Sequence, residues 1–216
     1  MLEALGADVR EVRVPADLDG LAGLVMPGGE STTMSLGVER EGLAAPLRAL
    51  AARGTPVLGT CAGLIMLDRH HLGVMDLTCE RNGFGRQVSS FEADLQLRGM
   101  RDGPMRAVFI RAPFIAEHGP AVDILAAVDG RAVAARQGTV LAVAFHPELG
   151  ADARLHKAFL AQVRTSREEP AAARATGAVT SAPGAAARAD PDRDPYADVG
   201  SGAILGACAS PSPATS

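Results

Sequence analysis

The sequence of 216 residues is poor in aromatic side chains and has no excess of positive charge. Tryptophan is absent and aromatic residues make up 3% of the chain, whereas hydrophobic residues make up 47%. The core is therefore expected to be aliphatic. The formal net charge of −4 gives no electrostatic reason to expect a nucleic acid or an anionic membrane as a partner.

Cysteines and long apolar runs are also scarce. The three cysteines are widely spaced and fit neither a disulfide framework nor a zinc site. No Cys/His cluster has metal-ligand spacing, and we predict no metal and no cofactor. No apolar run reaches ~18 residues, and the sequence does not start like a signal peptide. We therefore expect a cytoplasmic protein with reduced cysteines.

The order of strand-like and helix-like patterns predicts an α/β fold for the first third of the chain. Residues 9–14 alternate apolar and charged side chains, which is typical of a strand near a sheet edge, and the apolar segments at residues 24–26 and 57–60 are typical of short strands. Residues 32–36 are expected to form a turn of helix. Residues 43–53 have leucines at helical spacing, and Gly54 marks the end of that helix. Strands that alternate with helices favour a parallel sheet covered by helices.

Strand-like segments dominate the chain after Asp68. The pairs Asp129-Gly130 and Gln137-Gly138 are typical of tight turns, so we expect antiparallel pairs to be added to the sheet. Residues 152–163 are predicted as a closing helix. The expected strands lie at residues 74–80, 87–97, 105–111, 124–128, 132–135 and 140–145.

The composition changes after residue 164. The remaining segment is rich in alanine, proline, glycine, serine, arginine and aspartate and has no sustained periodicity. We interpret residues 1–164 as one domain and residues 165–216 as a disordered, low-complexity tail. Leu205 is too isolated to build a core, and Cys208 receives no role.

A cysteine directly follows the predicted strand at residues 57–60. Gly59 and Gly63 stand two positions to either side of Cys61, which gives the Gly-x-nucleophile-x-Gly pattern of a nucleophile elbow. Such a strand-to-helix turn needs small neighbours, and a helix beginning at Ala62 would favour the thiolate at its N-terminus. The simpler alternative is a buried cysteine that packs like a small hydrophobic residue.

The candidate base lies about 85 residues further along the chain, as is usual for groups that meet only in the fold. A turn at Pro147 can bring the carboxylate of Glu148 to one imidazole nitrogen of His146 while the other nitrogen faces the thiol. Cys61, His146 and Glu148 are therefore the candidate catalytic triad. The alternative is a surface turn without a function. The remaining histidines are expected to be solvated: His70, His71, His118 and His156.

A glycine pair follows the predicted strand at residues 24–26. Gly28 and Gly29 free this loop to turn and to expose N–H groups, which acyl chemistry at a cysteine needs for the developing oxyanion. We predict an oxyanion hole from the loop amides of Gly28 and Gly29 and the amide of Ala62. A phosphate-binding loop is disfavoured because no Gly-Lys-Ser/Thr is present, and a plain turn is the other alternative.

Six segments occur together in an order that is typical of one family. They are Pro27-Gly-Gly-Glu-Ser-Thr-Thr33, Gly59-Thr-Cys-Ala-Gly63, Arg81-Asn-Gly-Phe-Gly-Arg-Gln87, Ser90-Phe-Glu-Ala-Asp94, Phe109-Ile-Arg-Ala-Pro113 and Phe145-His-Pro-Glu148. Together they resemble the PdxT/SNO family of class I (triad) glutamine amidotransferases, the glutaminase subunits of pyridoxal 5′-phosphate synthase. The cysteine and His-Pro-Glu segments are shared across the class, whereas the first, third and fifth segments point to this family. The resemblance covers about residues 2–163.

The resemblance implies a flavodoxin-like α/β domain of three layers that hydrolyses L-glutamine to L-glutamate and ammonia. Cys61 would be the nucleophile, with His146 and Glu148 as its relay, whereas Cys79 matches no functional position. The implied partner is the synthase subunit, in a hetero-oligomer, which uses the ammonia to build pyridoxal 5′-phosphate from a pentose phosphate and a triose phosphate. The residues implied to surround bound glutamine are Gly29, Glu30, Ser31, Arg81, Ile110 and Arg111.

The resemblance starts inside the first helix of the family. Members carry a strand and a loop before this helix, so we expect the sheet to lack that strand, with unpaired backbone groups and a slot beside the active site. A misassigned start codon or a degenerate copy would account for this departure. Two other functions stay open: a glutaminase that serves another synthase, and a catalytically inactive partner protein.

Overall fold

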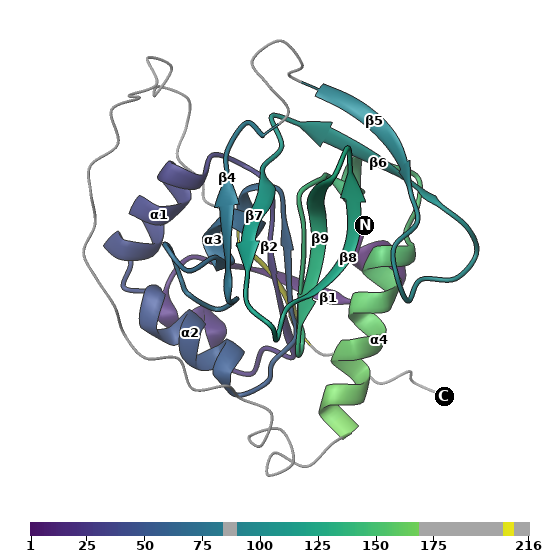
Figure 1. The fold of residues 1–216 in the computed structure, drawn as a ribbon. Helices are drawn as coiled ribbons and strands as arrows, with labels where there is room; N and C mark the ends of the chain where they lie inside the picture. The colour runs from purple at the N-terminus through teal and green to yellow at the C-terminus, as the bar shows by residue number, and fades with distance from the viewer. Residues whose placement is uncertain (84–89, 169–204, 210–216) are drawn as a thin grey trace, which may run out of the picture.

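The computed structural model describes residues 1–83, 90–168 and 205–209. Among these residues, nine strands form one central sheet (Figure 1). In spatial order the strands are β1 (Asp8–Val12), β11 (Leu205–Ala209), β2 (Gly23–Met26), β3 (Val57–Thr60), β10 (Val140–Val143), β9 (Arg131–Gln137), β7 (Phe114–His118) and β4 (Leu77–Glu80), with β8 (Asp123–Val128) paired to β9.

The central sheet is mixed, as the sequence predicts. Its centre is parallel, because β3 pairs in parallel with both β2 and β10. Strands β9, β7, β4 and β8 add antiparallel pairs on one side. The turn between β8 and β9 is the expected Asp129-Gly130, and both residues have positive φ (48° and 75°), as tight hairpin turns require.

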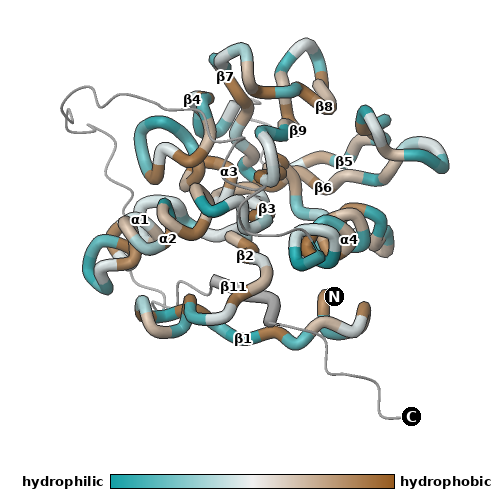
Figure 2. Tube along the Cα trace, turned by 90° about the horizontal axis from the view of Figure 1, so that it is seen from below, coloured by the Kyte–Doolittle hydropathy of each residue, from teal (hydrophilic) through white to brown (hydrophobic). Residues whose placement is uncertain are grey.

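Helices cover both faces of the sheet. Figure 2 shows α1 and α2 on one side and α4 on the other, and α3 lies with α1. This confirms the predicted three-layer arrangement. The four helices are α1 (Ser31–Arg40), α2 (Ala44–Ala52), α3 (Ala62–Leu67) and α4 (Arg154–Glu168). None of the helices in the described residues is long and apolar enough to cross a membrane.

The core between these layers is mainly aliphatic, as the composition indicates. All residues of β3 and β10 are buried, and Leu47 and Leu50 turn the predicted apolar face of α2 inward. Burial of such side chains stabilises the fold by roughly 1.5–3 kcal/mol each. Three phenylalanines are fully buried in addition: Phe109, Phe145 and Phe159.

Two further strands form a separate hairpin. Strands β5 (Ser90–Leu95) and β6 (Met105–Ile110) pair only with each other among the described residues. Figure 2 places this hairpin on the same side of the central sheet as α4. The ring of Phe109 in β6 meets Phe145 edge-on, with 5.6 Å between centroids, so the hairpin is anchored beside the end of β10.

Strand β11 corrects the prediction of a structureless tail. Leu205–Ala209 pairs antiparallel with all five residues of β1 and with three residues of β2, so the unpaired backbone and open slot that we expected in the sheet are not found between β1 and β2. Helix α4 also continues to Glu168, past the predicted domain end at residue 164. The rest of the predicted tail, residues 169–204 and 210–216, lies outside the described residues.

Smaller differences concern the bounds of elements. The sequence predicts one helical turn after the glycine pair, but α1 runs for ten residues. It predicts no strand at β7, and it extends β10 to Phe145 instead of Val143. Residues 87–89 of one predicted strand lie outside the described residues. Short 3-10 helices complete the structure: η1 (Glu3–Leu5), η2 (Pro15–Leu18) and η3 (Pro147–Leu149).

Candidate active site

Cys61 occupies the turn between β3 and α3 in a rare backbone conformation. Its φ is 49° and its ψ is −106°, a combination that non-glycine residues avoid because of steric strain. The Cys61 N–H donates to the carbonyl of Val143 at 2.9 Å, and the side chain is 7% exposed. This is the geometry of a nucleophile elbow, in which a tight turn lifts the side chain out of the sheet.

The two glycines that flank the cysteine are required by close packing. A Cβ on Gly63 would lie 1.9 Å from the carbonyl oxygen of Met26, and one on Gly59 would lie 2.9 Å from the carbonyl oxygen of Gly63. Neither backbone atom can move away easily. The Gly-x-Cys-x-Gly spacing therefore lets α3 begin directly against the ends of β2 and β3.

His146 and Glu148 lie just beyond β10. His146 directly precedes the short helix η3, and Glu148 lies within it. The Nδ1 atom of His146 is 2.7 Å from Oε1 of Glu148, so the turn at Pro147 brings the carboxylate to the imidazole as the sequence predicts. The imidazole is mostly buried, while the Glu148 side chain is 40% exposed. Glu148 is placed to hold the ring orientation through Nδ1.

The parallel pairing of β3 with β10 brings the cysteine and the histidine together. Thr60 pairs with Val143, so the residues that follow both strands leave the sheet at the same edge, where α/β proteins place their sites. Interaction with the Cys61 side chain, followed by that with Glu148, raises the pKa of His146 to about 10. His146 is therefore protonated at neutral pH and suited to pair with a thiolate.

The carboxyl of Glu148 is held in its charged form. Burial alone would raise its pKa, but the hydrogen bond with His146, a backbone hydrogen bond and the charge of His146 outweigh burial, and the pKa lies below its usual value. The pair is thus a charged carboxylate against an imidazolium.

Strand β6 contacts both members of the thiol–imidazole pair. The carbonyl oxygen of Val108 accepts the N–H of His146 at 2.8 Å, and the carbonyl oxygen of Ile110 lies 3.9 Å from Sγ of Cys61. Arg111 follows with φ of 44°, another conformation that is unusual for a non-glycine residue. The predicted glutamine-site residues Ile110 and Arg111 therefore adjoin the cysteine.

The glycine loop after β2 packs against the imidazole. A Cβ on Gly28 would lie 2.4 Å from Cε1 of His146, so only glycine fits at this position. Ala62 is the first residue of α3, and the first N–H groups of a helix have no partner within it. The loop at Gly28 and the amide of Ala62, which we predict as oxyanion donors, therefore lie next to His146 and Cys61.

Glu30 and Arg81 both contact the first turn of α1. The carboxylate of Glu30 caps this helix, accepting the N–H of Thr32 at 2.9 Å and that of Thr33 at 2.6 Å. A guanidinium nitrogen of Arg81 lies 3.2 Å from Oγ1 of Thr32, and Ser31 is buried. Part of the predicted glutamine site is therefore gathered here, although the Glu30 carboxylate is already engaged. Residues 84–87 of the third family-like segment lie outside the described residues.

Sequence reasoning was wrong about His156. It predicts a solvated side chain, but His156 is 5% exposed and its Nδ1 has no hydrogen-bond partner. Burial lowers the pKa of His156. The signal was present, because His156, Phe159 and Val163 recur at helical spacing and share the buried face of α4. The backbone contacts of Val108 and Ile110, in contrast, have no sequence signature.

Other cysteine and acidic positions do not add to this site. Burial, followed by the charge of Asp68, raises the pKa of the Cys79 thiol, which fits the packing role expected for it. In the described parts of the chain, no group of three or more His, Cys, Asp or Glu residues could hold a metal ion.

Known proteins are similar to this chain in fold and in sequence. A crystal structure described as a glutamine amidotransferase matches with a TM-score of 0.71 and 42% identity, over 76% of this chain and 90% of that chain. Pyridoxal 5′-phosphate synthase subunit PdxT of Geobacillus kaustophilus is 53% identical over 173 residues, which are 77% of this chain and 88% of that protein. The protein of the same name from Acidothermus cellulolyticus is also 53% identical, over 73% of this chain and 83% of its own length.

Together, fold and sequence define the class as that of the glutamine amidotransferases. More narrowly, the SNO glutamine amidotransferase family matches residues 1–165. The chain belongs to this family. The resemblance that the six sequence segments indicate is therefore confirmed.

Proposed function

We propose that this chain is the glutaminase subunit of a pyridoxal 5′-phosphate synthase and that Cys61, His146 and Glu148 carry out the hydrolysis of L-glutamine. The observation that carries the proposal is the position of His146. It lies between the Glu148 carboxylate, at 2.7 Å, and the Cys61 side chain, and these two partners raise its pKa to about 10. An imidazolium beside a cysteine at a strained elbow is the arrangement that cysteine acyl transfer needs.

The first half of the reaction forms an acyl-enzyme. The Cys61 thiolate attacks the carbon of the side-chain amide, and the oxygen of that amide takes the negative charge. N–H groups of Ala62 and of the Gly28–Gly29 loop stabilise this oxyanion. The C–N bond then breaks as the imidazolium of His146 donates its proton to the leaving nitrogen. Ammonia and a γ-glutamyl thioester are the products, and His146 is left neutral.

The second half releases glutamate. Neutral His146 takes a proton from a water molecule, which attacks the thioester carbon. The C–S bond breaks, glutamate leaves, and the thiolate and imidazolium are restored. Glu148 keeps its charge through both halves and holds the imidazole through Nδ1, so that the other ring nitrogen always faces the sulfur and the substrate.

The free amino acid is recognised by charged groups and loop amides around the cysteine. Arg81 and Arg111 supply guanidinium groups suited to the α-carboxylate of glutamine. Because the Glu30 carboxylate caps α1, Glu30 acts by shaping the Gly29–Ser31 backbone along the substrate. The exposed side chain of Ile110 packs against the aliphatic part of glutamine.

Ammonia passes to the synthase subunit within a hetero-oligomer. Two relatives that carry the name pyridoxal 5′-phosphate synthase subunit PdxT are 53% identical to this chain over 172–173 residues, and the proposal extends their named assembly to it. Hydrolysis without an acceptor would waste ammonia, so activity should rise when the synthase subunit docks.

The test is ammonia release from L-glutamine by the purified chain, with and without a pyridoxal 5′-phosphate synthase subunit, followed by glutamine-dependent formation of pyridoxal 5′-phosphate. We expect turnover that increases with the synthase subunit and vanishes in Cys61→Ala. The matched control is Cys79→Ala, which removes a thiol that lies on β4 and outside the site.

Three results would contradict the proposal. Ammonia release by the Cys61→Ala variant would show that Cys61 is not the nucleophile. If the Cys79→Ala variant lost ammonia release to the same extent, the loss in Cys61→Ala would reflect impaired folding and not removal of the nucleophile. Turnover without any glutamine-dependent pyridoxal 5′-phosphate would leave a glutaminase that serves another acceptor.

A further inference from the structure

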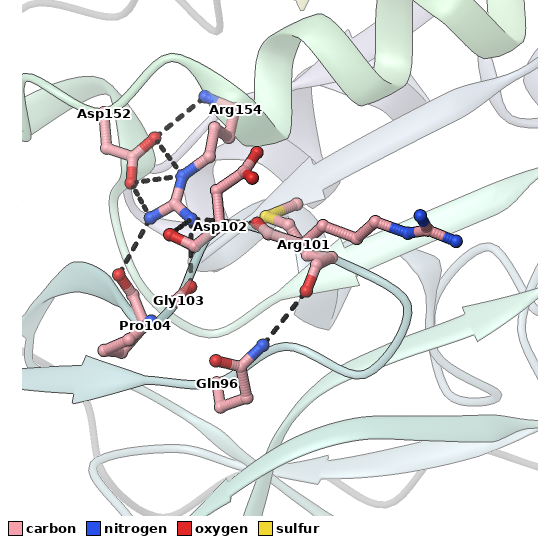
Figure 3. A network of polar contacts seen from close by, with 8 residues as sticks. Gln96, Arg101, Asp102, Gly103, Pro104, Asp152 and Arg154 are labelled. Carbon is pink, nitrogen blue, oxygen red and sulfur yellow. Dashed lines mark hydrogen bonds and ion pairs between the residues drawn. The ribbon is translucent and has the colours of Figure 1, made fainter.

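Arg154, the first residue of α4, gathers four consecutive backbone carbonyls. Its Nη1 atom donates to three of them at 2.9–3.1 Å and its Nη2 atom donates to the fourth at 2.8 Å. Figure 3 shows the guanidinium between these carbonyls and the carboxylate of Asp152. The four acceptors are Arg101, Asp102, Gly103 and Pro104, in the connection from β5 to β6.

The carboxylate of Asp152 holds the guanidinium in this orientation. Nε of Arg154 lies 3.0 Å from both oxygens of Asp152, and Nη2 lies 2.5 Å from one of them. Hydrogen bonds from Arg154 keep the pKa of the Asp152 carboxyl below its usual value. Asp152 also accepts the backbone N–H of Arg154 at 3.0 Å, so the carboxylate fixes both the helix start and the side chain.

The connection from β5 to β6 needs such a cation. Four neighbouring carbonyl oxygens that point to one place repel each other, and the loop also holds Asp102 at a φ of 74°, where a non-glycine residue is strained. A guanidinium offers five N–H donors in a rigid plane, whereas an ammonium offers three. Arg154 is therefore what keeps this connection in its observed shape and attached to α4.

Strand β6 starts directly after this loop and ends at the nucleophile. Pro104 precedes the strand, the carbonyl of Val108 binds the His146 N–H, and the carbonyl of Ile110 faces Cys61. A displacement of β6 along its axis by a fraction of the ~3.3 Å residue repeat would therefore move both contacts together.

The turn that carries His146 is held between two anchors. Before the turn, the N–H of His146 donates to the carbonyl oxygen of Val108 in β6. After the turn, the chain reaches Asp152 and Arg154 within a few residues, and Arg154 holds the loop before β6. Strand β6 and the turn at His146 are therefore connected twice: by the hydrogen bond between Val108 and His146, and by Arg154, which holds the loop before β6.

We infer that Arg154, oriented by Asp152, is a positioning residue that sets β6 and the His146–Glu148 turn against Cys61. This inference rests on the proposed function for its kinetic readout but not for its spectroscopic one. Arg154 does not touch the reacting atoms, and it acts through the backbone of β6.

The experiment compares Arg154→Ala with the wild type at a temperature where both are fully folded. We call the contacts of Arg154 with the four carbonyls and Asp152 the clamp. Loss of the clamp should lower kcat for glutamine hydrolysis by about 10- to 100-fold, because displacements of catalytic groups near 1 Å have costs of this size. The NMR titration midpoint of His146 should fall from about 10 toward the ordinary value of 6.5, since the imidazole leaves its partners. This second readout needs no substrate.

The matched control is Arg106→Ala. Arg106 lies on β6 itself, but its side chain pairs with Glu92 and Asp94 inside the hairpin and does not reach α4. We expect its kcat and its His146 titration to match the wild type. Arg154→Lys tests whether the planar guanidinium is required or only its charge. Its kcat should be little higher than that of Arg154→Ala, because the three donors of an ammonium cannot serve four carbonyls and a carboxylate.

Asp152→Asn guards against an Arg154→Ala protein that does not fold. It keeps the loop contacts but weakens the orientation of Arg154, so we expect the same changes at smaller size. Unchanged kcat and an unchanged His146 titration in the folded Arg154 or Asp152 variant would overturn the inference, as would an equal loss in Arg106→Ala. If the wild type does not hydrolyse glutamine, the proposed function fails, while the His146 titration still decides the role of the clamp.

Discussion

The two sides of β2 in the central sheet are built differently. Toward β3 and β10, the strands are parallel, short and buried at every residue. Toward β1, the neighbours are antiparallel, and β1 buries only Val12. The first side is held by side-chain packing and ends in the candidate active site, whereas the second depends on backbone pairing with a strand from the far end of the chain.

This difference separates catalytic geometry from closure of the sheet. On the packed side, the parallel register places Cys61 and His146 at one edge of the sheet, so substitutions of the candidate catalytic residues should change chemistry more than folding. On the β11 side, the pairing positions no residue of the candidate site. Changes there should affect stability before activity.

The largest effect is expected for Glu148→Gln on the catalytic side. The amide cannot hold a protonated imidazole as the carboxylate does, so kcat should fall by about 10³- to 10⁴-fold. The pKa of His146, now near 10, should fall in the same variant because one of its two main partners is lost. Glutamine hydrolysis and an NMR titration of His146 measure the two effects. A variant with wild-type kcat would remove Glu148 from the mechanism.

Gly28→Ala should have the next largest effect. The added Cβ would lie 2.4 Å from Cε1 of His146, which forces the imidazole or the Gly28–Gly29 loop to move and should lower kcat by about 10²-fold if this loop supplies the proposed oxyanion donors. Gly150→Ala is the matched control, because its φ is −91° and its nearest neighbour would be 3.5 Å away. Similar kinetics for the two variants would argue against a close fit of the loop to His146.

Ala207→Pro tests the other side of the sheet. Ala207 pairs with Arg10 in β1 and Leu24 in β2, and proline removes a backbone donor from a strand that has neighbours on both sides. We expect the free energy of unfolding to fall by about 1–3 kcal/mol, since a ladder hydrogen bond is lost and its acceptor is left without a partner, with faster amide exchange in β1 and β2 and little change in kcat of the folded protein. Ala207→Gly keeps the N–H and should cost only about 0.5–1 kcal/mol. Equal stability of the proline variant and the wild type would show that β11 does not support the sheet.

The same contrast explains what could be predicted from the sequence. Cys61 lies between two glycines and follows an apolar strand, and His146 and Glu148 flank a proline after another strand, so local pattern and turn chemistry were sufficient. The pairing of Leu205–Ala209 with β1 and β2 joins segments nearly 200 residues apart in sequence, and no local pattern carries that information. The clamp by Arg154 was missed for a related reason, because its partners are backbone carbonyls that any residue could supply.

The smallest expected effect is a pH dependence that links the catalytic side to stability. Because the pKa of His146 is raised from 6.5 to about 10, its protonated form stabilises the fold fully below about pH 6.5, and this contribution is lost as the pH rises toward 10. The difference in free energy of unfolding between the wild type and His146→Gln should therefore shrink over this range. We expect a change on the order of 2 kcal/mol, since one pKa unit corresponds to about 1.36 kcal/mol and water screens the part-exposed Glu148. Urea unfolding of both proteins between about pH 6 and about pH 10 measures this change. A difference that stays constant with pH would mean that the imidazolium pairing does not stabilise the folded chain, and the packed side of the sheet would then owe its stability to apolar burial alone.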